Sequence, residues 1–315
     1  MIKKLYYDLV FKIRPPKVGV IATLTRSGTW YCRCFFFAFH KLLKGDEFDS
    51  TELVREFYAQ KRRFHVKETL GLDKFLIYHA TCPGFKEHYW GSLRPAWEKL
   101  EFYGEGRVHD NGDLVMQKGK RKKVYDPYYN RNAKFVYIYR NPFDSAVSFM
   151  KSLENYKNPQ LMYKKDSTGN KLSFENARDY LYSAGLPAFI KQIFTFTAMR
   201  KMFPQNIVMI PYERLIREPE KVFTSFLEHF GYIVSADSER VKILKAIELA
   251  SQENLKQAER NLGMNLANDR AQPGDTQIRG GAVGKWKEYF DQTDLERTEK
   301  IMSEFGLSLK DCVLE

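Results

Sequence analysis

The chain has 315 residues, of which 43% are hydrophobic, so it is long enough to bury a sizeable core. No linker rich in proline, glycine or serine divides it, and no low-complexity tract or internal repeat is found, which excludes a repeat protein and predicts a single domain over residues 1–315. The formal net charge of +12 predicts an electropositive surface, which suits an anionic ligand, a nucleic acid or a membrane face without choosing among them.

Four apolar runs rich in β-branched and aromatic residues predict strands, at 18–24, 74–80, 134–140 and 206–212. Helical segments are expected between and after them, at 30–43, 51–62, 143–155, 174–202 and 219–230. Because the strand runs do not alternate with polar residues, they suit a parallel sheet covered on both faces. The predicted fold class is therefore α/β, with a central parallel β-sheet flanked by helices in a doubly wound, P-loop-like arrangement. Ligands of such folds bind beyond the carboxyl ends of the strands.

Two regions have weaker patterning, residues 81–131 and the tail beyond residue 250. We expect both to hold substrate loops and lids. Residues 81–131 are interpreted as an insertion, and residues 250–290 as a segment that covers the ligand. The basic run KGKRKK at 118–123 is interpreted either as a solvated loop or as a surface that attracts a polyanionic ligand.

The cysteines and the first residues bear on the cellular compartment. The four cysteines show no zinc-site spacing, and a chain of this length does not need disulfides: Cys32, Cys34, Cys82 and Cys312. Charges interrupt the N-terminal stretch every few residues, so it lacks the apolar core of a signal peptide. No apolar run approaches the length of a membrane span. We therefore expect free thiols, no transmembrane segment and a cytoplasmic location.

The stretch TLTRSGTW, residues 23–30, lies between the first strand and the first long helix. It offers hydroxyl groups, the guanidinium of Arg26 and, at Gly28, a backbone that an anion can approach closely. Together with the free amides and the dipole of a helix N-terminus, these groups suit a phosphate. The GxxxxGK[ST] loop of magnesium-dependent nucleotide triphosphatases is absent. Taken alone, the stretch also fits an ordinary capped turn.

A second motif, YRNPFDSAVSF, follows the third strand. Asn141 suits a helix cap, Pro142 the first helical position and Asp144 the first turn. Arg140 then lies at the carboxyl end of the strand, with Ser148 two turns further along the helix, and the two together suit a second phosphate group. The alternative is a structural ion pair between Arg140 and Asp144.

A third motif, IRGGAVGKWKEYF, covers residues 278–290. Its glycines allow the amides to wrap an anion, and Arg279, Lys285 and Lys287 add positive charge. The alternative is a flexible surface loop.

In this order, the three motifs resemble those of the cytosolic sulfotransferases, which use 3′-phosphoadenosine 5′-phosphosulfate (PAPS). TLTRSGTW is similar to that family's 5′-phosphosulfate loop, TYPKSGTTW, YRNPFDSAVS matches its 3′-phosphate motif RNPxDxxxS, and RGGAVGKW resembles RKGxxGDW. PYERL and LASQENL are similar to its YED and TSFxxM segments. The resemblance spans about residues 18–290 and implies the P-loop NTPase-like sulfotransferase fold.

The resemblance also implies a reaction and its residues. A sulfuryl group would pass in line from PAPS to an acceptor, leaving adenosine 3′,5′-bisphosphate (PAP), with no metal required. The 5′-phosphosulfate would be held by Arg26, Ser27, Gly28 and Thr29, with Trp30 beside them, and Arg26 would stand near the bridging oxygen in place of the usual lysine. The 3′-phosphate would be held by Arg140, Ser148, Ser251 and Arg279 with the amides of Gly280 and Gly281, and Tyr212 would lie near the adenine.

Several positions depart from the family pattern. Tyr31 stands where a tryptophan stacks on the adenine, Gln252 replaces an adenine-stacking phenylalanine, and Lys285 replaces the aspartate of GDW. The dimerisation element KxxxTVxxxE would fall at KEYFDQTDLE, which lacks TV, so the sequence leaves a homo-oligomer open but does not indicate one.

The catalytic base is a histidine in this family, and two histidines compete for the role here. His79 in FLIYHATCPGF follows a strand and precedes Pro83, which resembles the family's KTHxP context without its lysine. His109 lies in the turn-like GRVHDNGD. We interpret His79 as the general base that accepts the acceptor's proton, with His109 as the alternative.

The acceptor is expected to be a small alcohol, phenol or amine, with a carbohydrate next, and the aromatic stretches 82–97 and 125–130 are interpreted either as its pocket or as core. Two other functions stay open. One is a P-loop-type binder of a nucleotide or nucleic acid, although the arginines stand singly at strand ends and not in a stripe with exposed aromatic residues, so no nucleic-acid partner is expected. The other is a sulfotransferase-like fold that binds PAPS without catalysis.

Overall fold

The computed structural model of the chain describes residues 14–24, 26–59, 66–79, 127, 130–153, 174–234, 236–263 and 283–311. Of Tyr58, Ala59, Tyr78, His79 and Asp311 it describes the backbone alone. Within these residues, four strands form one parallel sheet in the order β2-β1-β3-β4. They are β1 (Val18–Thr23), β2 (Lys74–His79), β3 (Ala133–Tyr139) and β4 (Ile207–Pro211). Each strand begins and ends within one residue of its predicted bounds.

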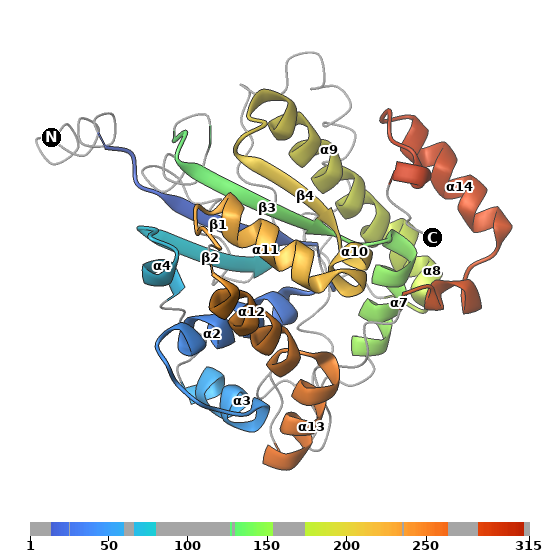
Figure 1. The fold of residues 1–315 in the computed structure, drawn as a ribbon. Helices are drawn as coiled ribbons and strands as arrows, with labels where there is room; N and C mark the ends of the chain where they lie inside the picture. Colours follow the sequence, from blue (N-terminus) through green and yellow to red (C-terminus); the bar gives the residue numbers. More distant parts are fainter. Residues whose placement is uncertain are drawn as a thin grey trace, which may run out of the picture.

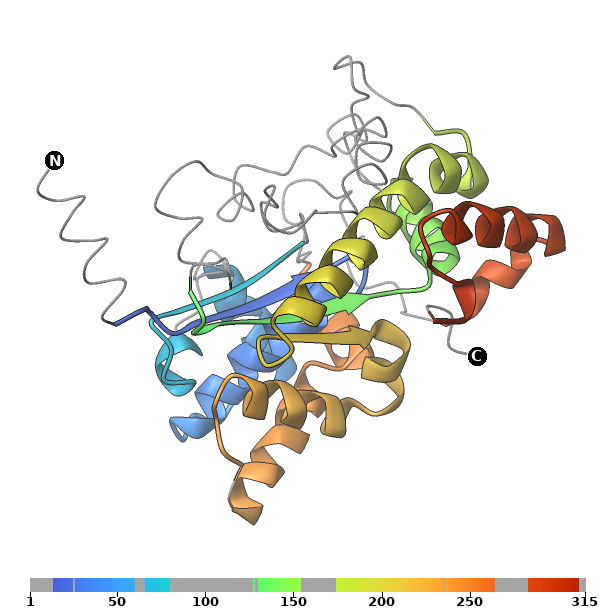
Figure 2. The same ribbon diagram turned by 90° about the horizontal axis from the view of Figure 1, so that it is seen from above.

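Helices cover both faces of the sheet, so the domain has three layers (Figures 1 and 2). One face carries α2 (Thr29–Leu43), α3 (Ser50–Ala59), α4 (Val66–Thr69), α10 (Tyr212–Arg217), α11 (Pro219–His229), α12 (Asp237–Leu249) and α13 (Gln252–Leu262). The other face carries α7 (Pro142–Leu153), α8 (Ala177–Tyr180), α9 (Leu186–Met202) and α14 (Gln292–Ser303). This arrangement confirms the predicted α/β fold with a parallel sheet flanked by helices.

The strand side chains explain why both faces need a cover. Successive residues of a strand point to opposite faces, and in β3 Val136 and Ile138 join the core on the α2 side while Phe135 and Tyr137 join the core on the α9 side. The ring of Tyr137 stacks on Phe196 of α9 with the ring centroids 4.1 Å apart. All four β3 side chains are fully buried, which is why the run reads as apolar throughout.

Helix α2 is fixed at the centre of its layer by aromatic contacts. Phe35 stacks on Phe223 of α11 with the ring centroids 3.7 Å apart, and Phe36 contacts Phe75 of β2 at 5.0 Å. The three phenylalanines on α2 and α11 are fully buried. Because a helix held along its length cannot shift easily, these contacts also fix the position of its N-terminus at the edge of the sheet.

The structure corrects the sequence analysis at several helices. The helix expected at 174–202 begins later and consists of α8, a π-helical turn at Leu181–Gly185 and α9. The tail, expected to form loops, contains α13 and α14, and α12 was not predicted at all. These helices were missed because each buries only a narrow stripe, such as Ile243, Ala246 and Leu249 of α12, among many charged residues. None of the described helices is both long and apolar enough to cross a membrane.

We expect truncation of Phe223 to test the packing that holds α2. Phe223→Ala should lower the free energy of unfolding by about 3–5 kcal/mol, because it leaves a cavity beneath α2. Ile233→Ala, at a side chain that is 78% exposed, is the control and should change it by less than about 0.5 kcal/mol. Urea denaturation measures both values, and a loss at Phe223 no larger than that at Ile233 would contradict this account of the core.

Candidate functional site

The register of the sheet brings the ends of its strands together at one edge. Thr23, the last residue of β1, lies opposite His79 of β2 and Ile138 of β3, and Tyr139 lies opposite Pro211 of β4. The residues that follow these strands, including Arg140 and Tyr212, therefore leave the sheet on the same side as the loop between β1 and α2. This is the edge at which open α/β sheets bind their ligands.

Among the described residues of the loop between β1 and α2, two have a backbone in the left-handed region. Arg26 has φ 67°, which is uncommon for a residue other than glycine, and Gly28 has φ 85°. A Cβ atom on Gly28 would lie 2.9 Å from Cε2 of Tyr212, so a side chain has no room there. The amide of Ser27 donates to the carbonyl of Leu24 at 3.0 Å, which closes the turn. The glycine of the motif is thus required by both conformation and close packing.

The N-terminus of α2 offers hydrogen-bond donors to a ligand. Its N-cap residue is Gly28, which has no side chain to accept from the first helical amides, and the first turn contains no acidic residue. Ser27 is fully buried, and its hydroxyl oxygen has no hydrogen-bond partner within the described part of the chain. Thr29 Oγ1 is hydrogen-bonded to Thr23 Oγ1. A phosphate or sulfate group fits this combination of a buried hydroxyl, backbone amides and a helix dipole.

Two hydrogen bonds join this loop to α7 and to the residue that precedes its cap. Nη1 of Arg140 donates to the carbonyl oxygen of Arg26 at 3.0 Å, and Nε of Arg26 donates to Oγ of Ser148 at 3.1 Å. The guanidinium carbon of Arg140 also lies 4.7 Å from the ring centroid of Tyr212, within cation–π range. The structure therefore brings together four of the predicted site residues, from three different strand ends.

A buried carboxyl group that the sequence analysis missed binds the backbone of the residue after Arg140. Oε1 of Glu213 accepts from the amide of Asn141 at 3.0 Å, and Asn141 Oδ1 accepts from the amide of Phe143 at 2.9 Å as the cap of α7. Glu213 is only 2% exposed, and this burial raises the pKa of its carboxyl group. The signal available in the sequence was an acidic residue directly after Tyr212, the last residue of the predicted strand.

Asp144 does not form the structural pair with Arg140 that the sequence left open. Its two carboxylate oxygens accept instead from the backbone amides of Gly284 and Trp286, at 2.8 and 3.0 Å. Residues 284–286 of the third motif are thereby joined to the second motif, at the first turn of α7. The residues of the third motif that were predicted to bind phosphate, Arg279, Gly280 and Gly281, lie outside the described residues.

The other described residues of the predicted site, Ser251 and Trp30, contact different neighbours. Nε2 of Gln252, at the start of α13, donates to the hydroxyl of Tyr212 at 3.2 Å, and the preceding Ser251 caps α13 by accepting from the amide of Asn254. Trp30 packs against Phe57 of α3, with the ring centroids 5.8 Å apart. The start of α13 thus reaches the site through Tyr212, while Trp30 points toward α3.

Of the two candidate bases, the structure describes the backbone of His79 only. His79 ends β2, and its backbone lies directly opposite Thr23 at the base of the loop. Neighbouring strands are about 4.8 Å apart, so His79 lies at the same edge of the sheet as the loop. His109 lies outside the described residues.

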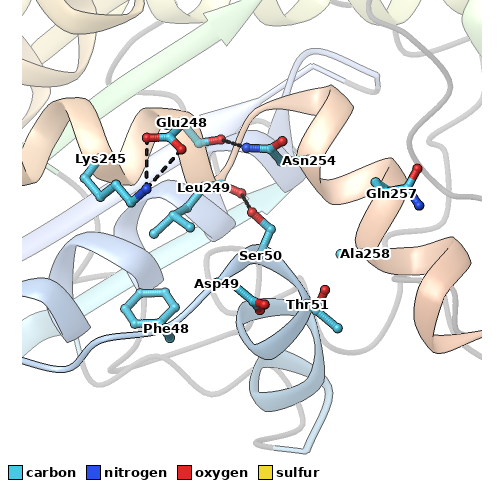
Figure 3. A pocket seen from close by; sticks show the side chains of 10 residues that line it. All are labelled: Phe48, Asp49, Ser50, Thr51, Lys245, Glu248, Leu249, Asn254, Gln257 and Ala258. Atoms are coloured by element: carbon cyan, nitrogen blue, oxygen red, sulfur yellow. Dashed lines mark hydrogen bonds and ion pairs between the residues drawn. The ribbon is translucent and has the colours of Figure 1, made fainter.

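A hollow of about 290 Å3 lies apart from this site, between α3, α12 and α13 (Figure 3). None of the described residues of the candidate site lines it. Its polar groups bond to one another: Lys245 pairs with Glu248 at 3.0 Å, and the hydroxyl of Ser50 donates to the carbonyl of Leu249 at 3.0 Å. With its polar groups paired in this way, the hollow is not where we place the anion.

Comparison with known proteins agrees with the predicted fold and with the family resemblance. Residues 16–307 match the model of the sulfotransferase domain family. The chain is 25% identical over 185 residues to cytosolic sulfotransferase 16 of Arabidopsis thaliana, and 28% identical over 186 residues to a flavonol sulfotransferase-like protein of Flaveria bidentis. Each match covers 57% of this chain, and they cover 52% and 57% of the relatives, so the chain spans about half the length of the curated relatives it matches.

A solved structure has the same fold. It is retinol dehydratase in a complex with retinol and PAP, with a TM-score of 0.51 and 16% sequence identity, and the match covers 99% of this chain and 87% of that chain. At this identity the likeness shows the fold alone.

The buried carboxyl group of Glu213 predicts a pH-dependent stability. Since burial raises its pKa, the folded chain holds this proton up to a higher pH than the unfolded chain, and ionisation lowers stability as pH rises above the ordinary value of about 4.3. Glu213→Gln keeps an oxygen for the Asn141 amide and removes the ionisation. We therefore expect the variant to gain stability relative to the wild type between about pH 4 and pH 7.

Urea denaturation at the two pH values measures this gain. Glu228→Gln, at an exposed position of α11, is the control and should show no comparable change. A Glu213→Gln variant that loses stability relative to the wild type as the pH rises would contradict the assignment.

Proposed function

The chain belongs to the sulfotransferase family, and from this premise we propose that it transfers a sulfuryl group from PAPS to a hydroxyl or amine of a small molecule and releases PAP. The observation that carries the proposal is the loop before α2. There the buried hydroxyl of Ser27 has no hydrogen-bond partner among the described residues. The adjacent Gly28 has no side chain that would keep an anion away from the backbone amides. These are the features expected of a cradle for the 5′-phosphosulfate.

The 5′ side of the ligand would be held by the loop and the first turn of α2. Ser27 would donate its hydroxyl, the amides around Gly28 and Thr29 would point at the anion, and Arg26 would bring positive charge. PAPS supplies the sulfuryl group when bound. Arg26 would stabilise negative charge that develops on the bridging oxygen, although a guanidinium is a poorer proton donor than the lysine it replaces.

The 3′-phosphate would be held on the side of α7. Arg140 and Ser148 already lie together at this edge through their bonds to Arg26. We propose that Ser251, Arg279 and the amides of Gly280 and Gly281 complete the set, as the resemblance implies. Tyr212 would contact the adenine, with Gln252 bonded to its hydroxyl and Trp30 further along α2.

His79 is the proposed general base. Its backbone at the end of β2 stands next to Thr23 and thus beside the loop that would hold the transferred group. A histidine there would accept the proton of the acceptor as its oxygen or nitrogen attacks sulfur. His109 is the alternative base.

The names of the compared proteins support a small acceptor with a hydroxyl group. One relative is named for a flavonol, and the structural neighbour holds retinol. We propose an alcohol or phenol first, an amine next and a carbohydrate after these. The relative named as a cytosolic sulfotransferase supports the expected cytoplasmic location.

Binding of PAP tests the proposal directly. Calorimetry should detect tight binding of PAP to the wild type, and a ligand at one hundred times its dissociation constant should stabilise the fold by about 2.7 kcal/mol. Arg140→Ala should abolish this stabilisation, because it removes the charge on the 3′ side and the bond to the loop. ATP with magnesium is the control ligand, and we expect the protein not to bind it. Binding of ATP in preference to PAP would favour another nucleotide-binding function.

Replacement of His79 separates an active transferase from a fold that only binds PAPS. With PAPS and a panel of phenols and alcohols, His79→Ala should lower kcat by about 10²–10⁴-fold, as expected for loss of a general base. Its affinity for PAP should stay within about twofold of the wild type, because the phosphate contacts remain. Unchanged turnover would remove His79 from the mechanism, and His109→Ala would then test the alternative. A wild type that binds PAP but transfers no sulfuryl group to any acceptor would support a sulfotransferase-like protein that binds PAPS without catalysis.

A further inference from the structure

Asp144 is a buried acid whose partners lie far away in the sequence. It occupies the first turn of α7 and is 2% exposed. Its Oδ2 accepts from the amide of Gly284 at 2.8 Å, and its Oδ1 accepts from the amide of Trp286 at 3.0 Å. Hydrogen bonds from backbone amides to a buried carboxylate are strong and directional. One side chain thus fixes the turn at 284–286 onto α7.

Aromatic packing holds the same turn from the other side. The ring of Trp286 stacks on Phe143 with the centroids 5.2 Å apart, and Phe290 meets Phe143 at 5.0 Å. Gly284 has φ 85°, a conformation that glycine adopts without strain. The turn is therefore shaped to present its two amides to the carboxylate and not merely to lie against the helix.

The position of Asp144 on α7 links this contact to the site. Arg140 precedes the helix, four residues before Asp144, and Ser148 lies one helical turn after Asp144 on α7. Both neighbours bond to the Arg26 loop. An ordinary acidic residue in a first helical turn interacts favourably with the helix dipole and makes no distant contact. Asp144 in addition connects two chain segments that are separated by 140 residues.

We propose that Asp144 is a positioning residue for the 3′-phosphate side of the site, an inference that rests on the proposed function. Its two hydrogen bonds attach the 284–286 turn to the first turn of α7, between Arg140 before the helix and Ser148 one turn further along it. This attachment would maintain the positions of the Arg140 and Ser148 side chains that the 3′-phosphate needs.

The test compares two nucleotides on two matched variants. Asp144→Asn keeps the shape of the side chain but removes its charge and one acceptor. Asp294→Asn is the control, because Asp294 is likewise a buried acid in a first helical turn, accepts from Arg178 at 2.7 Å and has no hydrogen bond to the 284–286 turn within the described part of the chain. Dissociation constants for PAP and for adenosine 5′-phosphate are measured for each protein, together with the melting temperature.

The ratio of the two dissociation constants reports the 3′-phosphate alone. We expect Asp144→Asn to lower the preference for PAP by about tenfold or more, and Asp294→Asn to leave it within about twofold, even where both variants melt at similarly reduced temperatures. A merely structural role for Asp144 would lower the melting temperature without changing the ratio. An unchanged ratio in Asp144→Asn, or an equal loss in both variants, would overturn the proposal.

Two further measurements keep the result interpretable. Should Asp144→Asn fail to fold, Gly284→Ala strains the turn without altering α7 and should lower the same ratio. Tryptic cleavage after Lys285 and Lys287 in the ligand-free protein reports whether the turn is released. If the wild type itself shows no preference for PAP, the proposed function fails and this proposal falls with it. If the wild type prefers PAP and Asp144→Asn does too, the proposed function stands and only the role of Asp144 fails.

Discussion

The hydrogen bond from Arg140 to the carbonyl oxygen of Arg26 is the contact on which the site depends. That carbonyl belongs to a residue in the left-handed backbone region, and a non-glycine residue stays there only when its surroundings hold it. Arg140 restrains the backbone of Arg26 through this bond, and the side chain of Arg26 donates a hydrogen bond to Ser148. Each partner thus restrains the other, and the loop takes its shape from contacts within the protein. A site ordered by such contacts avoids part of the entropy that ordering on binding would cost.

The parallel sheet makes this contact possible. Residues 26 and 140 are far apart in the chain, but β1 and β3 are direct neighbours with Thr23 opposite Ile138, so the segments that follow them emerge side by side. The next neighbours add Tyr212 on one side and His79 on the other. Aromatic packing around α2 and α11 holds the helix that points its N-terminus at this edge. The fold thus supplies the positions, and a few polar residues at strand ends supply the chemistry.

The sequence predicted this arrangement well where the signal is local. All four strands were placed to within one residue because each is a short apolar run, and the first two motifs were found because glycine, proline and cap residues mark a strand–turn–helix. It predicted poorly where the partner is distant. Asp144 was recognised as a first-turn acid, but nothing near it in the sequence indicates the amides of Gly284 and Trp286. Glu213 was missed for the same reason, and α12 was missed because its charged surface hides a narrow apolar stripe.

A crystal structure of the protein with PAP would show whether the nucleotide binds at the edge of the sheet. We expect the 5′-phosphate within about 3.2 Å of the Ser27 hydroxyl and the first amides of α2, and the 3′-phosphate beside Arg140 and Ser148. The Arg140 bond to the carbonyl of Arg26 should be unchanged. A nucleotide bound in the hollow between α3, α12 and α13, or one whose phosphates lie away from Ser27 and Arg140, would contradict this account.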